Sequence, residues 1–338
     1  MKKKIGVIDV AQAADVSPAT VDRVLNGRGG VSPDKERRVL EWARKLKLDR
    51  NLQRRPNRMI RVGVIMQRPS NPFYELLGQA FAKANQDYFD VNMLVSQHYF
   101  DIQALDDTVK LILRLGSQLD ALIVVLQDHP QITSALQKMT RRIPVVTLAS
   151  DLPHSGRMSY VGLDNRAAGR VAGDLMGRLV GPAGGGIIVV SGLQQFIGQG
   201  EREMGFRTVL AERHPQCQLL AVLETREQPE QAERLVGEVL SRRQNIAGIY
   251  NLSSGDREIA RSMKTFRQDK PLTFITHELT PERKKLLIDG VIDIVIDQNP
   301  ALEVATAMAL IARHFGRTDV MAINQTTPIN IYTRENCW

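Results

Sequence analysis

The chain is poor in several residue types on which whole classes of protein depend. Its 338 residues include two cysteines, six histidines and 5% aromatic side chains. Cys217 and Cys337 lie far apart and form no motif, which argues against a disulfide framework and is typical of a reducing cytoplasm. The histidines have no metal-ligand spacing and no G-x-S-x-G segment is present, so neither a metal site nor a nucleophile elbow is predicted, and no cofactor is expected.

Long apolar stretches are also missing. No run of about 18 apolar residues occurs, so no membrane span is expected. Three lysines follow Met1, but no apolar segment of signal-peptide type comes after them. Together these features predict a cytoplasmic protein without a membrane partner.

The positive charge of the chain is concentrated at its start. Residues 1–61 carry 16 Lys and Arg against 7 Asp and Glu, a net charge of +9, whereas the whole chain carries +8. Residues 62–338 therefore carry a net charge of −1. A small basic domain joined to a nearly neutral large one is typical of a protein with a DNA-binding head. A solvated basic tail is the alternative, but the apolar residues of this segment recur at helical intervals.

Residues 7–27 have the pattern of two short helices joined by a tight turn. Val7 and the segment 10–14 form an apolar stripe. Ser17 is a candidate N-cap for the second helix, and Pro18 suits its first turn. Residues 20–25 continue the helical period, and Asn26-Gly27 can end the helix. Such a unit presents its second helix to the major groove of DNA.

This segment resembles the headpiece of the lac repressor (LacI/GalR) family of bacterial transcription regulators. The matching residues are the segments 8–11, 14–21 and 23–27, followed by Val31-Ser32-Pro33 and a basic helix near 35–47. The resemblance extends more loosely over nearly the whole chain. It implies a homodimeric regulator, a repressor, that binds double-stranded operator DNA and responds to a small effector molecule.

The resemblance also implies which headpiece residues contact DNA. Thr20 and Asn26 would mainly contact phosphate, while Arg23 could recognise a guanine edge. Asp22 occupies a position where most members have Ser; it could accept from cytosine or orient Arg23 through a salt bridge, which we favour. The predicted DNA-binding residues are Ser17, Ala19, Thr20, Asp22, Arg23 and Asn26.

The linker departs from the family pattern. Members usually follow the headpiece with Tyr-x-Pro-Asn and a short helix whose Leu wedges into the minor groove. In residues 46–57 only Asn51 matches well, and Pro56 would interrupt such a helix. Leu52 is a candidate wedge, and Arg54, Arg55 and Arg58 could instead hold the linker by charge. We therefore do not expect the usual hinge helix.

From residue 61 onward, apolar strands alternate with helical segments. About ten strands are expected, beginning with 61–66, 91–95, 120–126 and 143–148 and ending with 271–278 and 292–298. This alternation predicts parallel sheets covered on both faces, and the number of strands favours two lobes. The fold expected is a small all-α helix-turn-helix headpiece (1–60) followed by an α/β domain (61–338). The α/β domain resembles a type I periplasmic binding protein with two doubly wound lobes. We place lobe one at about 62–161 and 292–324, and lobe two at about 162–291 and 325–338.

Ligands bind beyond the carboxyl ends of the strands in such lobes. Asn71-Pro72-Phe73-Tyr74 resembles the Asn-Pro-Phe-Phe segment of ribose-type sugar-binding proteins, although it could simply cap a helix that packs by Phe73. Arg202 matches an Arg four residues before an aromatic residue, and Glu278 and Gln298 end later strands. Either Ser253 or Ser254 could replace a family Asn-Asp. The predicted effector-binding residues are Asn71, Phe73, Tyr74, Arg202, Ser253, Ser254, Glu278 and Gln298.

Three further segments have ambiguous roles. Asp151 could replace a family Asp that follows the strand 143–148, and Asp164-Asn165 is assigned to contacts between lobes. The segment 198–206 does not have the G-x-G-x-x-G spacing of a dinucleotide loop. The resemblance favours a sugar or polyol as effector. A transport-type solute-binding protein and an α/β enzyme using His277-Glu278 as an acid–base pair are the alternatives. The basic headpiece and the missing signal peptide disfavour the first, and the lack of metal-ligand spacing and of a nucleophile elbow disfavours the second.

Overall fold

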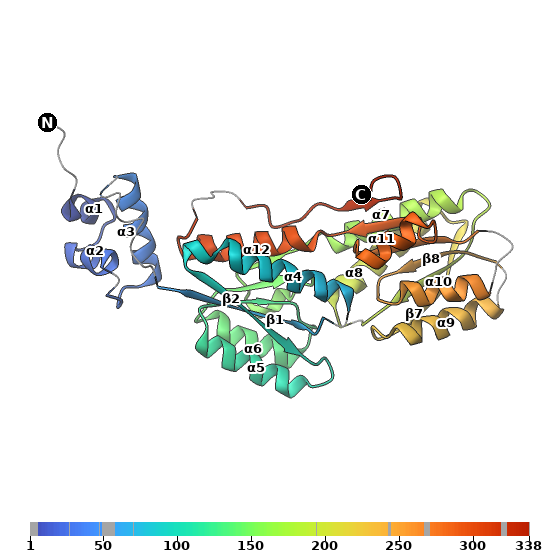
Figure 1. Cartoon of the computed structure of the whole chain (residues 1–338), viewed down its shortest axis with the longest axis horizontal. Coiled ribbons are helices and arrows are strands. Elements are labelled where there is room, and N and C mark those ends of the chain that lie inside the picture. Colours follow the sequence, from blue (N-terminus) through green and yellow to red (C-terminus); the bar gives the residue numbers. More distant parts are fainter. Residues whose placement is uncertain are drawn as a thin grey trace.

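The computed structural model describes residues 6–26, 28–46, 48, 58–69, 71–193, 195–242, 245–266, 271–318 and 323–337. A small helical headpiece is followed by two α/β lobes arranged along the long axis of the molecule (Figure 1). In the described part of the chain, no helix is both long enough and apolar enough to cross a membrane.

The headpiece contains three helices, α1 (Val7–Ala13), α2 (Pro18–Leu25) and α3 (Pro33–Lys45). Val10, Val21, Leu25 and Val39 are buried together between them. The predicted helix-turn-helix is confirmed, with the Ser17 hydroxyl accepting from the Thr20 amide at 3.1 Å. The interpretations of Gly27 as a helix stop and of residues 49–57 as an atypical linker concern residues outside the described ones.

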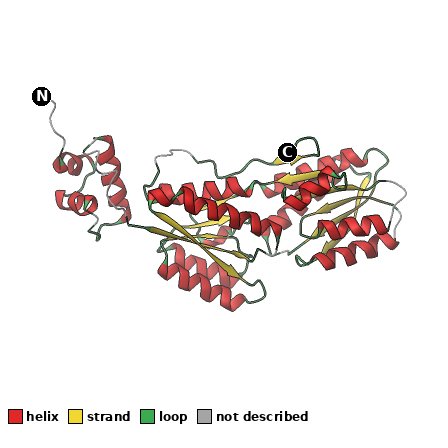
Figure 2. Cartoon of the chain, viewed as in Figure 1, coloured by secondary structure: helices red, strands yellow, loops and turns green. Residues whose placement is uncertain are grey.

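The first lobe contains a parallel five-stranded sheet in the order β2-β1-β3-β4-β5. Successive apolar side chains of β1 point to opposite faces of the sheet, so helices cover both faces. Val64 and Met66 pack against α4 and α12, and Ile65 packs on the side of α5 and α6 (Figure 2). The elements are β1 (Ile60–Gln67), α4 (Pro72–Asp87), β2 (Met93–Phe100), α5 (Leu105–Gln118), β3 (Ala121–Val124), α6 (Pro130–Thr140), β4 (Val145–Leu148), β5 (Ser159–Val161) and α12 (Pro300–His314).

The second lobe contains a six-stranded sheet in the order β11-β10-β9-β8-β6-β7, in which only β11 is antiparallel to its neighbour. Helices α7 and α8 cover one face, and α9, α10 and α11 cover the other. The elements are α7 (Asn165–Val180), β6 (Gly185–Ser191), α8 (Ile197–Arg213), β7 (Cys217–Glu224), α9 (Pro229–Arg242), β8 (Ile246–Asn251), α10 (Asp256–Thr265), β9 (Thr273–His277), α11 (Pro281–Ile288), β10 (Ile294–Asp297) and β11 (Asn330–Tyr332).

The chain crosses between the lobes three times, as expected, but the second crossing lies later than predicted. We assigned residues from about 292 onward to lobe one, whereas β10 pairs in parallel with β9 of lobe two. The physical reason is that Val295 and Ile296 complete opposite faces of the second core, and the chain leaves the sheet only at Asn299, whose side chain caps α12. The short strand β5 was not predicted as a strand.

The first and third crossings run side by side. The Gly162 amide donates to the Gln325 carbonyl at 3.3 Å, and the Thr327 amide donates to the Gly162 carbonyl at 3.0 Å. These paired segments and the turn at Asn299 form the connection between the two lobes.

Candidate functional site: the cleft between the lobes

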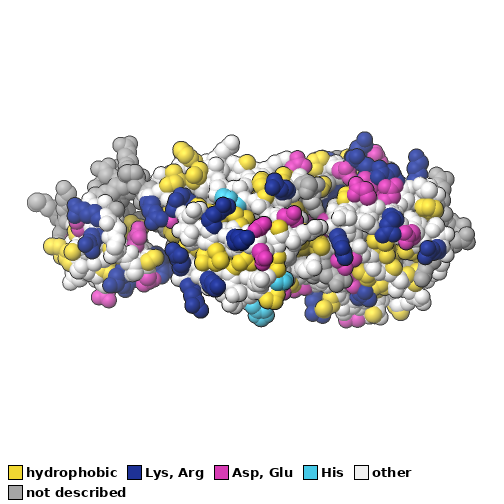
Figure 3. Space-filling model, turned by 90° about the horizontal axis from the view of Figure 1, so that it is seen from below, with side chains coloured by type: hydrophobic (Ala, Val, Ile, Leu, Met, Phe, Trp, Pro, Cys, Tyr) yellow, Lys and Arg dark blue, Asp and Glu magenta, His cyan; other side chains and the backbone are white. Residues whose placement is uncertain are grey.

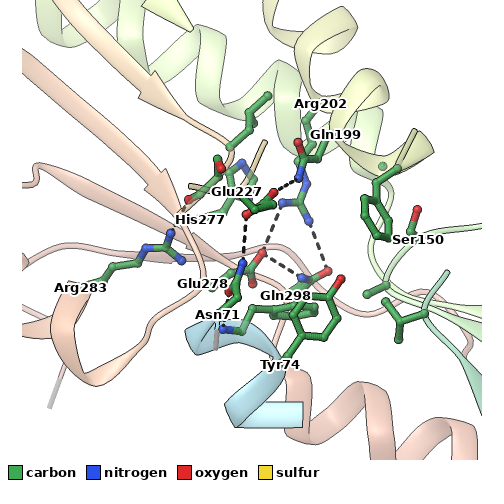
Figure 4. A pocket seen from close by; sticks show the side chains of 17 residues that line it. Asn71, Tyr74, Ser150, Gln199, Arg202, Glu227, His277, Glu278, Arg283 and Gln298 are labelled. Carbon is green, nitrogen blue, oxygen red and sulfur yellow. Dashed lines mark hydrogen bonds and ion pairs between the residues drawn. The ribbon is translucent and has the colours of Figure 1, made fainter. Parts of the chain in front are cut away.

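A cleft lies between the two lobes, beyond the carboxyl ends of their strands. It is lined by polar and apolar side chains from both lobes, and the interface between two domains is a common location for a small-molecule site. The polar lining residues are Asn71, Ser150, Gln199, Arg202, Glu227, Ser253, His277, Glu278, Arg283 and Gln298, and the larger apolar ones are Phe73, Tyr74, Val125, Ala149, Phe196 and Leu252. Figure 4 shows these side chains converging from both lobes.

Several residues at this edge have backbone conformations that side chains other than glycine rarely adopt. The φ angles are +59° at Ala149, after β4, +62° at Glu278, after β9, and +59° at Asn299, after β10. Arg226 and Glu227, beyond β7, have φ angles of +53° and +59°. Such strain persists where the surroundings hold it in place, and it is concentrated at functional sites. These strained residues therefore lie at the carboxyl ends of the strands, where the cleft also lies.

Arg202 is buried and lies at the centre of a hydrogen-bond network. Its Nε donates to Asn165 Oδ1 at 2.7 Å, and its two terminal nitrogens donate to Glu278 Oε1 and Gln298 Oε1, each at 3.3 Å. Gln298 Nε2 also donates to Glu278 Oε1, at 2.9 Å. All three branches of the guanidinium are therefore directed at protein acceptors (Figure 4).

Helix packing sets the position of Arg202. Helices α7 and α8 approach closely through glycines, so that a Cβ atom on Gly169 would lie 1.9 Å from the Arg202 carbonyl oxygen. Asp164 caps α7 by accepting from the Ala167 amide at 2.8 Å. This cap begins the helix at Asn165, which accepts from Arg202, so the segment that we assigned to contacts between lobes also orients the site.

Burial changes the protonation of two neighbouring groups. It raises the pKa of Glu278, while the nearby Arg202 opposes that rise. It lowers the pKa of His277 well below the usual range, and Arg202 and Arg283 lower it further, so the imidazole is neutral. His277 Nε2 lies 2.6 Å from the Tyr250 hydroxyl. Neutral His277 is therefore a hydrogen-bonding group of the cleft.

Three buried polar atoms of lining residues have no hydrogen-bond partner in the described part of the chain. They are Ser150 Oγ, His277 Nδ1 and Glu278 Oε2. Because an unpaired buried polar atom is costly, each is a position where a bound ligand or water would restore a hydrogen bond. The cleft thus offers a hydroxyl, an imidazole nitrogen and a carboxylate oxygen to a polar ligand.

Glu227 connects the two lobes. Its Oε2 accepts from Asn71 Nδ2 of lobe one at 3.0 Å, and its Oε1 accepts from Gln199 Nε2 of lobe two at 2.7 Å. Burial raises the pKa of its carboxyl, and the hydrogen bond from Gln199 opposes that rise. Asn71 also caps α4, since its Oδ1 accepts from the Phe73 amide at 2.9 Å. Both the capping and the site interpretations of Asn71 are therefore compatible with its geometry.

The structure brings most of the predicted effector residues to this cleft. Asn71, Phe73, Tyr74, Arg202, Ser253, Glu278 and Gln298 line it. Ser254 does not line it, because its hydroxyl is directed away and donates to the Glu227 carbonyl at 3.0 Å. Asp151 is not a lining residue either, since its carboxylate pairs with Arg157. The binding roles of all these residues remain predictions.

Sequence reasoning missed Glu227, Gln199, Ser150 and Arg283, and it considered His277 only as half of an acid–base pair. Ser150 could have been found, because it stands two residues after the end of a predicted strand. Glu227 stands three residues beyond its strand and carries no motif, and Arg283 lies in the first turn of α11. In the described residues, no group of three or more Asp, Glu, His or Cys side chains is placed to hold a metal ion.

The predicted DNA contacts lie on helix α2 and on its two cap residues, Ser17 and Asn26. Arg23 is exposed and makes no polar side-chain contact with another described residue, whereas Asp22 forms an ion pair with Arg28 at 2.9 Å. Asp22 therefore does not orient Arg23 as we expected, because the chain turns back beyond α2 and brings Arg28 to it. Asn26 Nδ2 donates to the Asp22 carbonyl at 2.9 Å. Figure 3 shows Lys and Arg side chains on the headpiece face seen from below.

The fold and cleft define a periplasmic-binding-protein-like domain behind a helix-turn-helix headpiece. A family model for the periplasmic binding protein domain matches residues 62–318, and one for bacterial regulatory proteins of the lacI family matches residues 7–51. The chain therefore belongs, over residues 62–318, to the periplasmic binding protein domain family, and its headpiece matches the lacI family of bacterial regulatory proteins.

Two named relatives match a large part of the chain. Catabolite control protein A of Priestia megaterium is 29% identical over 220 residues, a match that spans 62% of this chain and only 61% of that protein. The HTH-type transcriptional regulator DegA of Bacillus subtilis is 23% identical over 244 residues, covering 71% and 70% of the two chains.

Solved structures share the fold of the α/β domain. An ABC transporter solute-binding protein from Burkholderia graminis, in complex with D-arabinose, has a TM-score of 0.75 and 22% identity, covering 83% of this chain and 98% of that one. GanP, a glucose-galactose binding protein from Geobacillus stearothermophilus, has a TM-score of 0.73 and 19% identity, covering 83% and 99%. At this identity the likeness shows the fold alone.

Proposed function

We propose that the protein is a sequence-specific DNA-binding transcription regulator, a repressor, whose operator affinity is controlled by a small polyhydroxylated effector bound in the cleft. It acts as a homodimer in the cytoplasm and catalyses no reaction. This proposal is supported by the match of the headpiece to bacterial regulatory proteins of the lacI family and by the relative named as an HTH-type transcriptional regulator. The sugar-binding proteins that share the fold of the α/β domain support it as well.

The observation that carries the proposal is the set of hydrogen bonds that joins the lobes across the cleft. The Asn71–Glu227 bond and a bond from the Asp128 amide to the Gln195 carbonyl, at 2.8 Å, both connect lobe one to lobe two. A ligand that replaces or reinforces such bonds changes the angle between the lobes, because it binds the open and closed arrangements differently.

The headpiece is attached to lobe one, so a change in the angle between the lobes would move it. Asp120 pairs with Arg58 and Arg61, which precede and begin β1, and Arg317 donates to the Arg58 carbonyl at 2.9 Å. These contacts hold the entry to lobe one at the amino end of β1, opposite the cleft. Rotation of lobe one in a dimer would therefore change the separation of the two headpieces and the operator affinity.

The test begins with selection of an operator from random DNA by the full chain, followed by titration of the selected site. Arg23→Ala is expected to weaken binding to that site by roughly 1–3 kcal/mol and to relax the base preference at one position. Arg178→Ala, an exposed arginine of lobe two, is the matched control and should leave binding unchanged. Failure to select any sequence, or an Arg23→Ala variant with unaltered affinity and preference, would contradict the proposal.

Effector control has a separate test. A cleft ligand that changes operator affinity by some factor must have its own affinity changed by the same factor when operator is present. Titrating a ligand into the free protein and into the protein–operator complex measures both factors. A ligand that binds equally well in both titrations would not be an effector.

A further inference from the structure

Asp22 places a negative charge on α2, the helix that carries the predicted DNA contacts. Its side chain is 48% exposed, so the carboxylate is not hidden from a molecule that approaches this helix. A carboxylate repels the phosphate groups of DNA, and the repulsion is greatest where no cation stands beside it. The surface of α2 around Asp22 therefore depends on what compensates this charge.

Two side chains further along the chain cover the two oxygens of this carboxylate. Asn26, four residues later on the same face of the helix, donates from Nδ2 to Asp22 Oδ1 and to the Asp22 carbonyl. Arg28 Nη1 donates to Asp22 Oδ2 at 2.9 Å. Because the amide of Asn26 is neutral, Arg28 is the cation that compensates Asp22 in the described part of the chain.

Backbone hydrogen bonds fix the point from which the Arg28 side chain extends. The Arg28 amide donates to the Arg23 carbonyl at 2.9 Å, a bond common at the carboxyl ends of helices. The ion pair then fixes one nitrogen of the guanidinium. Since the side chain is held at both ends, it loses less conformational freedom when it binds a second anion.

The rest of the Arg28 guanidinium is available for such an anion. The side chain is 65% exposed, and its Nε and Nη2 atoms have no hydrogen-bond partner among the described residues. These two nitrogens form one edge of the planar group, and two parallel N–H donors match two oxygens of a phosphate.

The two residues after Arg28 leave open space. Gly29 and Gly30 have φ angles of +67° and +74°, conformations that favour glycine. A Cβ atom on Gly29 would have no described atom within 4 Å. Backbone without side chains allows the backbone of DNA to approach closely, as a phosphate contact requires.

We propose that Arg28 binds a phosphate group of the DNA backbone and that Asp22 is the positioning residue that holds Arg28 for this contact. The inference rests on the proposed operator binding and adds two residue roles to it. The N-terminal residues of a recognition helix contact base edges, whereas Arg28 follows the carboxyl end of α2, which favours a phosphate over a base. The pair carries no net charge, so Asp22 stands on α2 without repelling DNA.

Titration of the full chain with two duplexes of equal length tests the phosphate contact. One duplex contains the operator that the wild-type protein selects and the other has a random sequence, and each is titrated between about 50 and 200 mM salt. Arg28→Gln should weaken binding to both duplexes by a similar factor, about three- to tenfold. It should also reduce the slope of log K against log salt concentration by about one for each bound headpiece.

The control removes the same charge elsewhere on the headpiece. Arg37 of α3 is 62% exposed and pairs with Asp34, much as Arg28 pairs with Asp22. Arg37→Gln should therefore keep the wild-type slope and an affinity within about twofold.

A double-mutant cycle tests the role of Asp22. In the wild-type protein, Arg28→Gln removes the phosphate contact and also leaves Asp22 unpaired. In an Asp22→Asn protein it removes the contact alone. The loss of affinity caused by Arg28→Gln should therefore be at least about threefold larger in the wild-type background.

Each result decides the inference. A loss confined to the selected operator, with an unchanged salt slope, would make Arg28 a base-reading residue and overturn the phosphate contact. Equal losses in the two backgrounds would overturn the positioning role of Asp22. An Arg28→Gln variant that binds both duplexes like the wild-type protein would overturn both roles. If the wild-type protein selects no operator, the proposed function fails, while the random duplex still measures the contact.

Discussion

Replacing Arg202 by Met should destabilise the α/β domain strongly, because it removes one partner of a buried ion pair. The side chains of Arg202 and Glu278 are 7% and 8% exposed. Methionine retains the volume of the aliphatic stem but none of the three hydrogen bonds. Glu278 is then left as a buried carboxylate without its cation, and Asn165 loses its donor.

The magnitude follows from the cost of leaving a buried charge unpaired. Removing one partner of a buried ion pair costs about 3–5 kcal/mol, whereas removing both is often close to neutral. Arg202→Met should therefore lower the free energy of unfolding by about that amount at pH 7.5. Adding Glu278→Gln should recover at least about 1 kcal/mol, because no unpaired charge then remains.

The loss should also depend on pH. Burial already raises the pKa of Glu278, and Arg202 opposes that rise, so without Arg202 the pKa in the folded state rises further. The folded variant then retains a proton that the unfolded chain releases above about pH 4.3. The deficit grows as the pH increases from there towards the raised pKa, and it should be smaller at pH 5 than at pH 7.5.

Urea unfolding followed by circular dichroism at both pH values measures these quantities for the wild-type protein, the single variants and the double variant. The reasoning would be refuted by an Arg202→Met variant within about 0.5 kcal/mol of wild type, or by a double variant no more stable than Arg202→Met alone. A deficit that increased on going to pH 5 would contradict the assignment of the unpaired charge to Glu278.

Two further substitutions test the packing around the cleft. Gly169→Ala should lower the free energy of unfolding by about 1–3 kcal/mol and weaken effector binding, because its Cβ would meet the Arg202 carbonyl. Gly200→Ala is the matched control, since no atom lies within 4 Å of the Cβ that it adds. In urea unfolding it should be neutral or stabilising. Glu303 is fully buried, neither carboxyl oxygen has a partner in the described chain, and burial, then Glu278, raises its pKa well above the usual range. Glu303→Met should therefore increase the free energy of unfolding by about 1–3 kcal/mol. The gain should be larger at pH 8 than at pH 5, because the folded wild-type protein resists losing the proton of Glu303. A lower free energy of unfolding for Glu303→Met than for the wild-type protein at pH 8 would contradict this prediction.

Much of the fold follows from local patterns in the sequence. The helix cap at Ser17, the alternation of apolar strands with helices, and the strand at 185–191 are determined by residues close together in the chain. The boundary between the lobes at β10 was wrong by one strand, because a short strand buried on both faces has the same pattern in either lobe. Its neighbour in the sheet, β9, is what assigns it to lobe two.

The candidate site divides in the same way. By itself, the sequence determined a basic helix-turn-helix headpiece, strands with polar residues at their carboxyl ends, and motif residues such as Asn71 and Arg202. Only the tertiary structure decided that Asp22 pairs with Arg28, that Ser254 is directed away from the cleft, and that Glu227 joins the lobes. The physical reason is that hydrophobic periodicity and capping act over a few residues, whereas charge pairing and burial depend on which distant residues the folded chain brings into contact.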